Sequence, residues 1–133
     1  MRRVVITGMG IVSSLGTNQD EVTRSLRDSI PGIGFSQEAK DNGLRSHVCG
    51  QIDLNLPELI DRKLMRFMCP ASGYTYLAMK EAIEQAGLTE EHIRANSTGV
   101  ITGAGGASTV ELMDAIDTHR EKGIRRVGPY RVP

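Results

Sequence analysis

The sequence of 133 residues lacks the features that mark disulfide-rich, zinc-binding, membrane and secreted proteins. Its two cysteines, Cys49 and Cys69, form no CxxC pair, and no histidine-rich tract is present, which excludes a disulfide framework and gives no support for a zinc site. No apolar run approaches the roughly 18 residues of a membrane helix, and the apolar N-terminal stretch is too short and broken for a signal peptide. We therefore expect a cytoplasmic protein in a reducing compartment, without a metal or a membrane partner.

The sequence also lacks an excess of charge of one sign. Lys plus Arg (16) equals Asp plus Glu (16), so the whole-chain charge indicates no polyanionic partner such as a nucleic acid. Any argument from charge must rest on local clusters. With 39% hydrophobic and 24% charged residues, the composition is typical of an ordinary globular protein with one core.

An apolar run that ends in glycines occurs twice. VITGMG stands at residues 5–10 and VITGAG at residues 100–105. The β-branched residues predict short buried strands over residues 4–7 and 99–102, each bounded by glycine.

The rest of the chain reads mainly as helices. Asn18 with Glu21 and Ser108 with Glu111 have the spacing of capping boxes. Pro57 begins a helix that continues towards Phe67, and a further helix begins near Ala71. These helices carry apolar residues at helical spacing: Val22, Leu26 and Ile30; Leu59, Ile60, Leu64 and Phe67; Tyr74, Leu77, Ala78, Ala82, Ile83 and Ala86; Leu112, Ala115 and Ile116.

Two glycines and three short segments give the remaining predictions of secondary structure. Gly87 and Gly123 stand where helix C-caps belong, and residues 89–96 read as a short exposed helix. Residues 33–35 and 47–52 are candidate short strands. The order of elements predicts an α/β layered fold with parallel strands covered by helices. Because two confident strands are few for such a sheet, we expect the chain to be the N-terminal portion of a longer protein.

The first glycine pair allows two interpretations. Gly8, Gly10 and Ser13 give G-x-G-x-x-S, which approaches the fingerprint of an NAD(P)-binding Rossmann domain. Ser13 replaces the third glycine, however, and Asp28 stands at the distance of the expected acidic residue but inside a helix. We favour a packing role, in which the glycines permit a tight exit from a buried strand. For GAGGAS at residues 103–108 we also favour close packing of the backbone.

Six segments together resemble the N-terminal third of the β-ketoacyl-acyl-carrier-protein synthases, the elongating condensing enzymes of bacterial fatty acid synthesis. The segments are VVITGMGIVSSLG, GIGFSQEAKDNGLRSHVCG, IDRKLMRFM, AIEQAGL, VITGAGGAS and VGPYRVP. The resemblance covers nearly all of residues 1–133 and is strongest to the type I branch.

The resemblance implies a thiolase-like fold of five α/β/α/β/α layers and a homodimer, of which residues 1–133 are part of the N-terminal half. It implies that a cysteine thiolate takes the acyl chain from the carrier protein as a thioester. Malonyl-carrier protein then loses carbon dioxide, and the carbanion attacks the thioester. No cofactor is implied.

The resemblance places the nucleophilic cysteine and the two catalytic histidines beyond residue 133. Cys49 and Cys69 do not match the nucleophile, and we expect both to be small packing residues. His47, His92 and His119 do not match the catalytic histidines either. The resemblance therefore implies that this chain contains no catalytic residue.

Two basic clusters remain to be explained. Arg62, Lys63 and Arg66 are three or four residues apart and share one helix face. A second cluster is Arg120, Lys122, Arg125, Arg126 and Arg131. The resemblance implies that Arg62, Lys63, Arg66, Lys122, Arg125 and, more weakly, Arg45 dock the acidic acyl carrier protein, and that Gly106 and Ala107 line the acyl pocket. Without the resemblance, a solvated basic surface or a non-catalytic module that docks acidic partners stays open.

Overall fold

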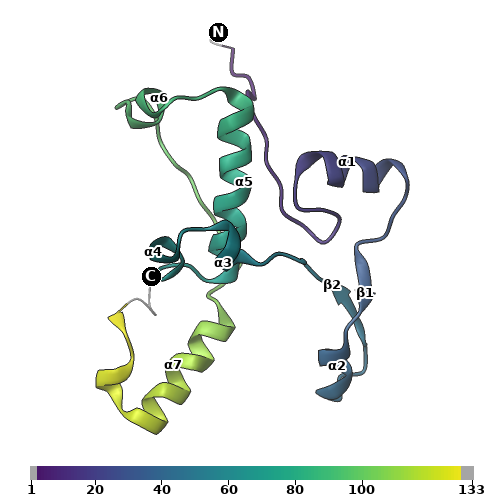
Figure 1. Cartoon of the computed structure of the whole chain (residues 1–133), viewed down its shortest axis with the longest axis vertical. Helices are drawn as coiled ribbons and strands as arrows, with labels where there is room; N and C mark the ends of the chain where they lie inside the picture. The colour runs from purple at the N-terminus through teal and green to yellow at the C-terminus, as the bar shows by residue number, and fades with distance from the viewer. Residues whose placement is uncertain (1–2, 130–133) are drawn as a thin grey trace. The chain divides into compact units, whose positions relative to one another are not determined.

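The computed structural model describes residues 3–129, and their contacts divide the chain into two compact units. Figure 1 labels the helices and strands of both. The first unit holds the chain as far as Asn55 together with Tyr74–Thr89. The second holds Leu56–Gly73 and the chain from Glu90 onward. Within residues 3–129, no helix is both long and apolar enough to cross a membrane.

Helices account for most of the regular structure. The elements in chain order are α1 (Gln19–Arg27), β1 (Ile33–Phe35), α2 (Gln37–Asp41), β2 (Val48–Gly50), α3 (Leu56–Leu59), α4 (Arg62–Met65), α5 (Pro70–Ala86), α6 (Glu90–Arg94), α7 (Thr109–Lys122) and the 3₁₀ helix η1 (Ile124–Arg126).

The predicted caps at Asn18, Ser108, Gly87 and Gly123 are confirmed, whereas Ile30, predicted on the first helix, lies beyond its end at Arg27. The side chain of Asn18 accepts the backbone N–H of Glu21 at 2.9 Å, and Ser108 Oγ accepts that of Glu111 at 3.4 Å. Such a cap contributes about 1 kcal/mol to helix stability. Gly87 and Gly123 adopt φ of +65° and +80°, the left-handed region in which a side chain is disfavoured.

The predicted strands have two different outcomes. Residues 33–35 and 48–50 form strands that pair antiparallel, with Ile33 opposite Gly50 and Phe35 opposite Val48. Residues 4–7 and 99–102 form no strand, and Val4 and Ile101 are 94% and 98% exposed. The prediction of two buried parallel strands is therefore wrong for this structure. A strand requires a neighbouring backbone to accept and donate its hydrogen bonds, and the only sheet within residues 3–129 is β1–β2.

The predicted helix from Pro57 to Phe67 is divided in two. Asp61 breaks it because its extended ψ of 133° ends the helical path, and its carboxylate accepts the backbone N–H of Lys63 at 2.7 Å to cap α4. The expected buried face of the last long helix is also wrong, because α7 has no buried residue and Leu112 is 55% exposed.

An extended N-terminal segment lies along α5 in the first unit, and Figure 1 shows it in purple beside that helix. Gln85 Oε1 accepts the backbone N–H of Met9 at 2.7 Å, and the carboxylate of Glu81 accepts that of Ile11 at 3.0 Å. Glu81 also accepts the N–H of Gln19 at 2.7 Å, which fixes the start of α1. Two side chains one turn apart on α5 therefore position both the segment and α1.

Gly8 and Gly10 allow this close approach. A Cβ added at Gly8 would lie 2.1 Å from the carbonyl oxygen of Ala82, and one at Gly10 would lie 1.8 Å from that of Ala78. The predicted packing role of both glycines is confirmed, although the surface they contact is a helix backbone rather than the exit of a strand.

We predict that Gly10→Ala lowers the free energy of unfolding by about 1–3 kcal/mol, because the methyl group must displace the helix backbone. Gly34→Ala is the matched control: Gly34 has nothing within 4 Å of the added Cβ, so we expect a change within about 0.5 kcal/mol. Urea unfolding measures both. Equal stability of the two variants would show that the segment does not pack against α5 in this way.

Candidate functional site

The first predicted basic cluster lies on α4 in the second unit. Arg62, Lys63 and Arg66 are all exposed. None of the ion pairs between described residues involves these three cations. The nearest carboxylate in sequence, Asp61, binds a backbone N–H as the helix cap. The three positive charges thus remain available to an external anionic group.

A hollow lies beside this cluster. Pro57 from α3 and Arg62, Met65 and Arg66 line it, and its volume is about 390 Å³. Arg62 and Arg66, four residues apart, border the same hollow, as the spacing predicts, whereas Lys63 does not line it. The guanidinium carbon of Arg66 also lies 5.9 Å from the centroid of the Phe67 ring, within the range of a cation–π contact.

The second predicted cluster lies at the end of α7. Lys122 is in the last turn of the helix and Arg125 is in η1, and both are exposed. Arg120 pairs with Asp117 at 3.9 Å on the surface, a contact that contributes little to stability. Arg131 and the end of the VGPYRVP motif lie outside the described residues. Both clusters on α4 and α7–η1 belong to the second unit.

Two further predictions concern exposed segments. Arg45 belongs to the first unit, where it is exposed between α2 and β2. Gly106 and Ala107 are exposed just before α7, and no atom lies within 4 Å of a Cβ added at Gly106. Gly103 and Gly105 are equally open, so the predicted close packing of this glycine-rich segment is wrong for this structure.

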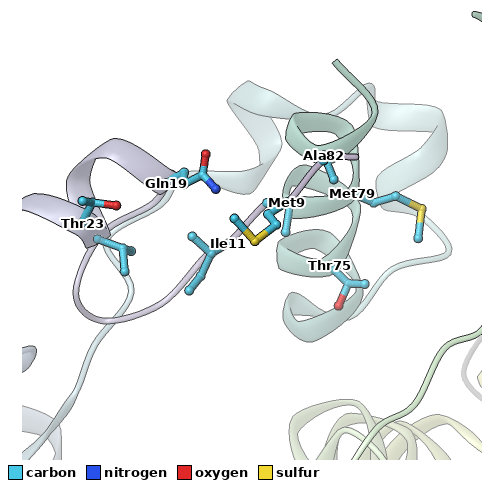
Figure 2. A pocket seen from close by; sticks show the side chains of 11 residues that line it. Met9, Ile11, Gln19, Thr23, Thr75, Met79 and Ala82 are labelled. Carbon is cyan, nitrogen blue, oxygen red and sulfur yellow. The ribbon is translucent and has the colours of Figure 1, made fainter. Parts of the chain in front are cut away.

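The first unit contains an open apolar groove between the N-terminal segment, α1 and α5. Figure 2 shows Met9 and Ile11 between the side chains of α1 and those of Met79 and Ala82 on α5. Its volume is about 650 Å³. Because Gly8 and Gly10 face the backbone of α5, the space that a pyrophosphate would need is filled by the helix. Asp28 is the C-cap of α1 and does not follow a strand. The structure therefore does not support the interpretation of this segment as an NAD(P)-binding fingerprint.

The cysteines and histidines are dispersed. Cys49 lies on β2 and is exposed, so its prediction as a packing residue is wrong, whereas Cys69 is partly buried before α5. His47 contacts Phe35 edge to face at 6.3 Å. Among residues 3–129, no three His, Cys, Asp or Glu side chains are grouped so that they could hold a metal ion.

A hydrogen bond with the Ser72 hydroxyl, 3.3 Å from Cys69 Sγ, is the largest cause that lowers the pKa of the Cys69 thiol, and the Ser72 backbone N–H adds to it. Both favour the thiolate because they stabilise its charge.

Three residues with a role in these sites, Glu81, Gln85 and Met65, were not singled out from the sequence. Glu81 and Gln85 lie one turn apart on α5 and accept backbone N–H groups of the N-terminal segment. Pro57 and Met65 meet only because Asp61 divides the expected helix. No spacing in the sequence predicts that meeting.

Comparison with known proteins assigns the chain to a family. The family model described as "Beta-ketoacyl synthase, N-terminal domain" matches residues 1–133. The chain is 51% identical to "3-oxoacyl-[acyl-carrier-protein] synthase 1" of Escherichia coli (strain K12), over 99% of this chain and 33% of the relative.

Two other relatives have the same coverage. The chain is 48% identical to "3-oxoacyl-[acyl-carrier-protein] synthase 1" of Haemophilus influenzae, over 99% of this chain and 33% of the relative. It is 35% identical to "Nodulation protein E" of Rhizobium sp. (strain N33), again over 99% and 33%. The chain spans about a third of the length of these curated relatives.

We predict that Ser72→Ala raises the pKa of the Cys69 thiol, because it removes the hydroxyl that stabilises the thiolate. The rate of iodoacetamide alkylation should then rise with pH at a higher midpoint than in the parent. Cys49→Ser in both proteins leaves Cys69 as the only thiol within residues 1–133. An unchanged or lower midpoint would contradict the Cys69–Ser72 contact.

Proposed function

Since the chain belongs to the beta-ketoacyl synthase family and matches its N-terminal domain over residues 1–133, we propose that it is the N-terminal portion of an elongating 3-oxoacyl-acyl-carrier-protein synthase. The observation that carries this proposal is the 51% identity, over 99% of the chain, to a protein of that name. The exposed cations on α4 fit it, because such an enzyme must bind an acidic carrier protein.

The proposed reaction is a decarboxylating Claisen condensation. A cysteine thiolate displaces the carrier thiol from an acyl-carrier thioester and becomes acylated. Malonyl-carrier protein loses carbon dioxide, and the electron pair of the broken C–C bond attacks the acyl-enzyme carbonyl. The cysteine leaves as thiolate, and the product is a 3-oxoacyl-carrier protein two carbons longer. We place the reacting cysteine and two histidines in the part of the synthase beyond residue 133, and no cofactor takes part.

The complete synthase would have the thiolase-like α/β/α/β/α layers and form a cytoplasmic homodimer. In it, we expect residues 4–7 and 99–102 to be covered by other parts of the protein. Their exposure supports this, because Val4, Ile6, Val100 and Ile101 are all at least 70% exposed. Apolar β-branched residues in extended backbone gain most when a second strand and a helix cover them.

The basic residues would dock the carrier protein. We assign this role to Arg62, Lys63, Arg66, Lys122, Arg125 and Arg45. Exposed cations accelerate the encounter with an acidic protein, while each individual pair contributes only about 0–1 kcal/mol. This combination suits a carrier that must arrive loaded and leave empty in every cycle.

We assign Gly106 and Ala107 to the wall of the acyl pocket. Both precede the N-cap Ser108 of α7, and Gly106 has open space around its Cα. Small side chains at these positions would leave room for a long acyl chain.

We predict that Lys63→Glu with Arg66→Glu in the complete synthase raises KM for malonyl- and acyl-carrier protein about tenfold or more, with kcat little changed. Reversed charges repel the acidic carrier but leave the reacting groups in place. Steady-state kinetics with carrier-bound and with free thioester substrates make the measurement.

Lys40→Glu is the control, since it reverses a cation on α2 that has no proposed docking role, and it should leave KM unchanged. If free thioesters lost activity as much as carrier-bound substrates, the cations would not act in docking.

We also predict that Gly106→Leu shortens the products, because its side chain would occupy space proposed for the end of the acyl chain. Gly106→Ala should have a smaller effect in the same direction. Chain lengths measured by mass spectrometry decide this, and an unchanged distribution in the leucine variant would count against the assignment.

A further inference from the structure

A single glycine lies where α3 meets the first turn of α5 in the second unit. Gly73 is the buried residue of α5. A Cβ added to it would lie 2.8 Å and 3.2 Å from the two δ carbons of Leu56, and 3.5 Å from Cδ1 of Ile60. Leu56 and Ile60 are only 6% and 4% exposed. Because carbon atoms pack at about 3.5–4.0 Å, only a residue without a side chain allows α3 to approach α5 so closely.

Nothing in the backbone of Gly73 itself requires glycine. Glycine is unfavourable inside a helix because it loses the most conformational freedom on folding, whereas alanine is the most favourable residue there. The glycines with a positive φ are Gly43, Gly87 and Gly123, and Gly73 is not among them. The close contact with α3 is therefore the feature of the structure that glycine serves at this position.

The same residue fixes both ends of the segment that carries the docking cations. Residues 61–68 follow Ile60 and lead into α5 at Cys69. At the start of this segment, Ile60 lies against Gly73. At its end, the backbone N–H of Gly73 donates to the carbonyl oxygen of Cys69 at 3.0 Å. The segment thus leaves from one residue of α5 and returns to it.

Between its two ends, the segment has little packing of its own. Its helix α4 is four residues long and contains no buried residue. The Asp61 cap fixes where α4 begins in the chain, but the position of α4 relative to α5 depends on the two ends. Because packed interiors transmit strain rather than absorb it, a displacement of Leu56 and Ile60 moves α4 as well.

We propose that Gly73 is a positioning residue for the three docking cations Arg62, Lys63 and Arg66. It allows α3 to pack on α5, and the packed α3 holds the cations where the carrier protein meets them. The inference rests on the proposed function and adds a buried residue that contacts neither substrate nor carrier. Exposed ion pairs are individually weak, so docking depends on several cations that meet their partners together.

The test compares Gly73→Ala with the parent in the complete synthase, by steady-state kinetics. KM for carrier-bound substrates should rise about threefold to fivefold, because the cations are displaced while the reacting groups stay in place. We expect kcat and the activity on free thioesters to be unchanged. Gly34→Ala is the control, since Gly34 has nothing within 4 Å of an added Cβ, and its KM should equal that of the parent.

Two further variants separate positioning from a loss of stability. Leu56→Val removes the δ carbons that the added methyl group would meet, so together with Gly73→Ala it should restore KM to within about twofold of the parent. With Lys63→Ala and Arg66→Ala already present, Gly73→Ala should raise KM no further, because the cations that it displaces are gone. Circular dichroism checks that each variant is folded.

The outcomes distinguish this inference from the proposed function. If Gly73→Ala leaves KM unchanged while Lys63→Ala with Arg66→Ala raises it, the positioning role is overturned and the docking role of the cations stands. An equal loss of activity on free thioesters, or no rescue by Leu56→Val, overturns the positioning role as well. If the two cation substitutions do not change KM, the docking assignment falls, and this inference falls with it.

Discussion

The first unit depends on the hydrogen bonds and close packing between α5 and the N-terminal segment. Glu81 and Gln85 bind the backbone N–H groups of Ile11 and Met9, and Glu81 also binds that of Gln19 at the start of α1. These bonds require the segment to touch the helix, and only residues without a side chain allow that at positions 8 and 10. An N–H bonded to a carboxylate contributes more than one bonded to a neutral acceptor. A short helix with few buried residues thereby gains a fixed position.

In the second unit, a single carboxylate caps the helix that carries the exposed cations. Asp61 forms none of the ion pairs between described residues, and its carboxylate accepts the Lys63 backbone N–H as the N-cap of α4. Arg62, Lys63 and Arg66 remain without an ion pair among the described contacts. The break between the two helices also brings Pro57 and Met65 to the same hollow. Exposed cations and apolar surface thus lie side by side at this break between two helices.

The two glycine-terminated runs show that local sequence alone does not determine whether a segment forms a strand. The same letters VITG lead into a segment bound along a helix at residues 8–11 and into an open one at residues 103–106. Propensity predicted a buried strand for both, and neither is one here, because a strand is a property of a pair of segments rather than of one. The short strands at residues 33–35 and 48–50 were predicted correctly, since the segment that pairs with each is close in the chain.

The sequence by itself determined the helix caps at Asn18 and Ser108, the left-handed glycines 87 and 123, the basic face of residues 62–66 and the family. The caps, the glycines and the basic face depend on interactions within a few residues. The family depends on similarity of sequence. Only the tertiary structure decided that Glu81 and Gln85 bind the N-terminal backbone, that Leu56 and Ile60 pack on Gly73, and that a hollow lies between two arginines. Those contacts join residues distant in the chain or separated by an unforeseen helix break, and their energy comes from burial and hydrogen-bond geometry, which a linear pattern does not contain.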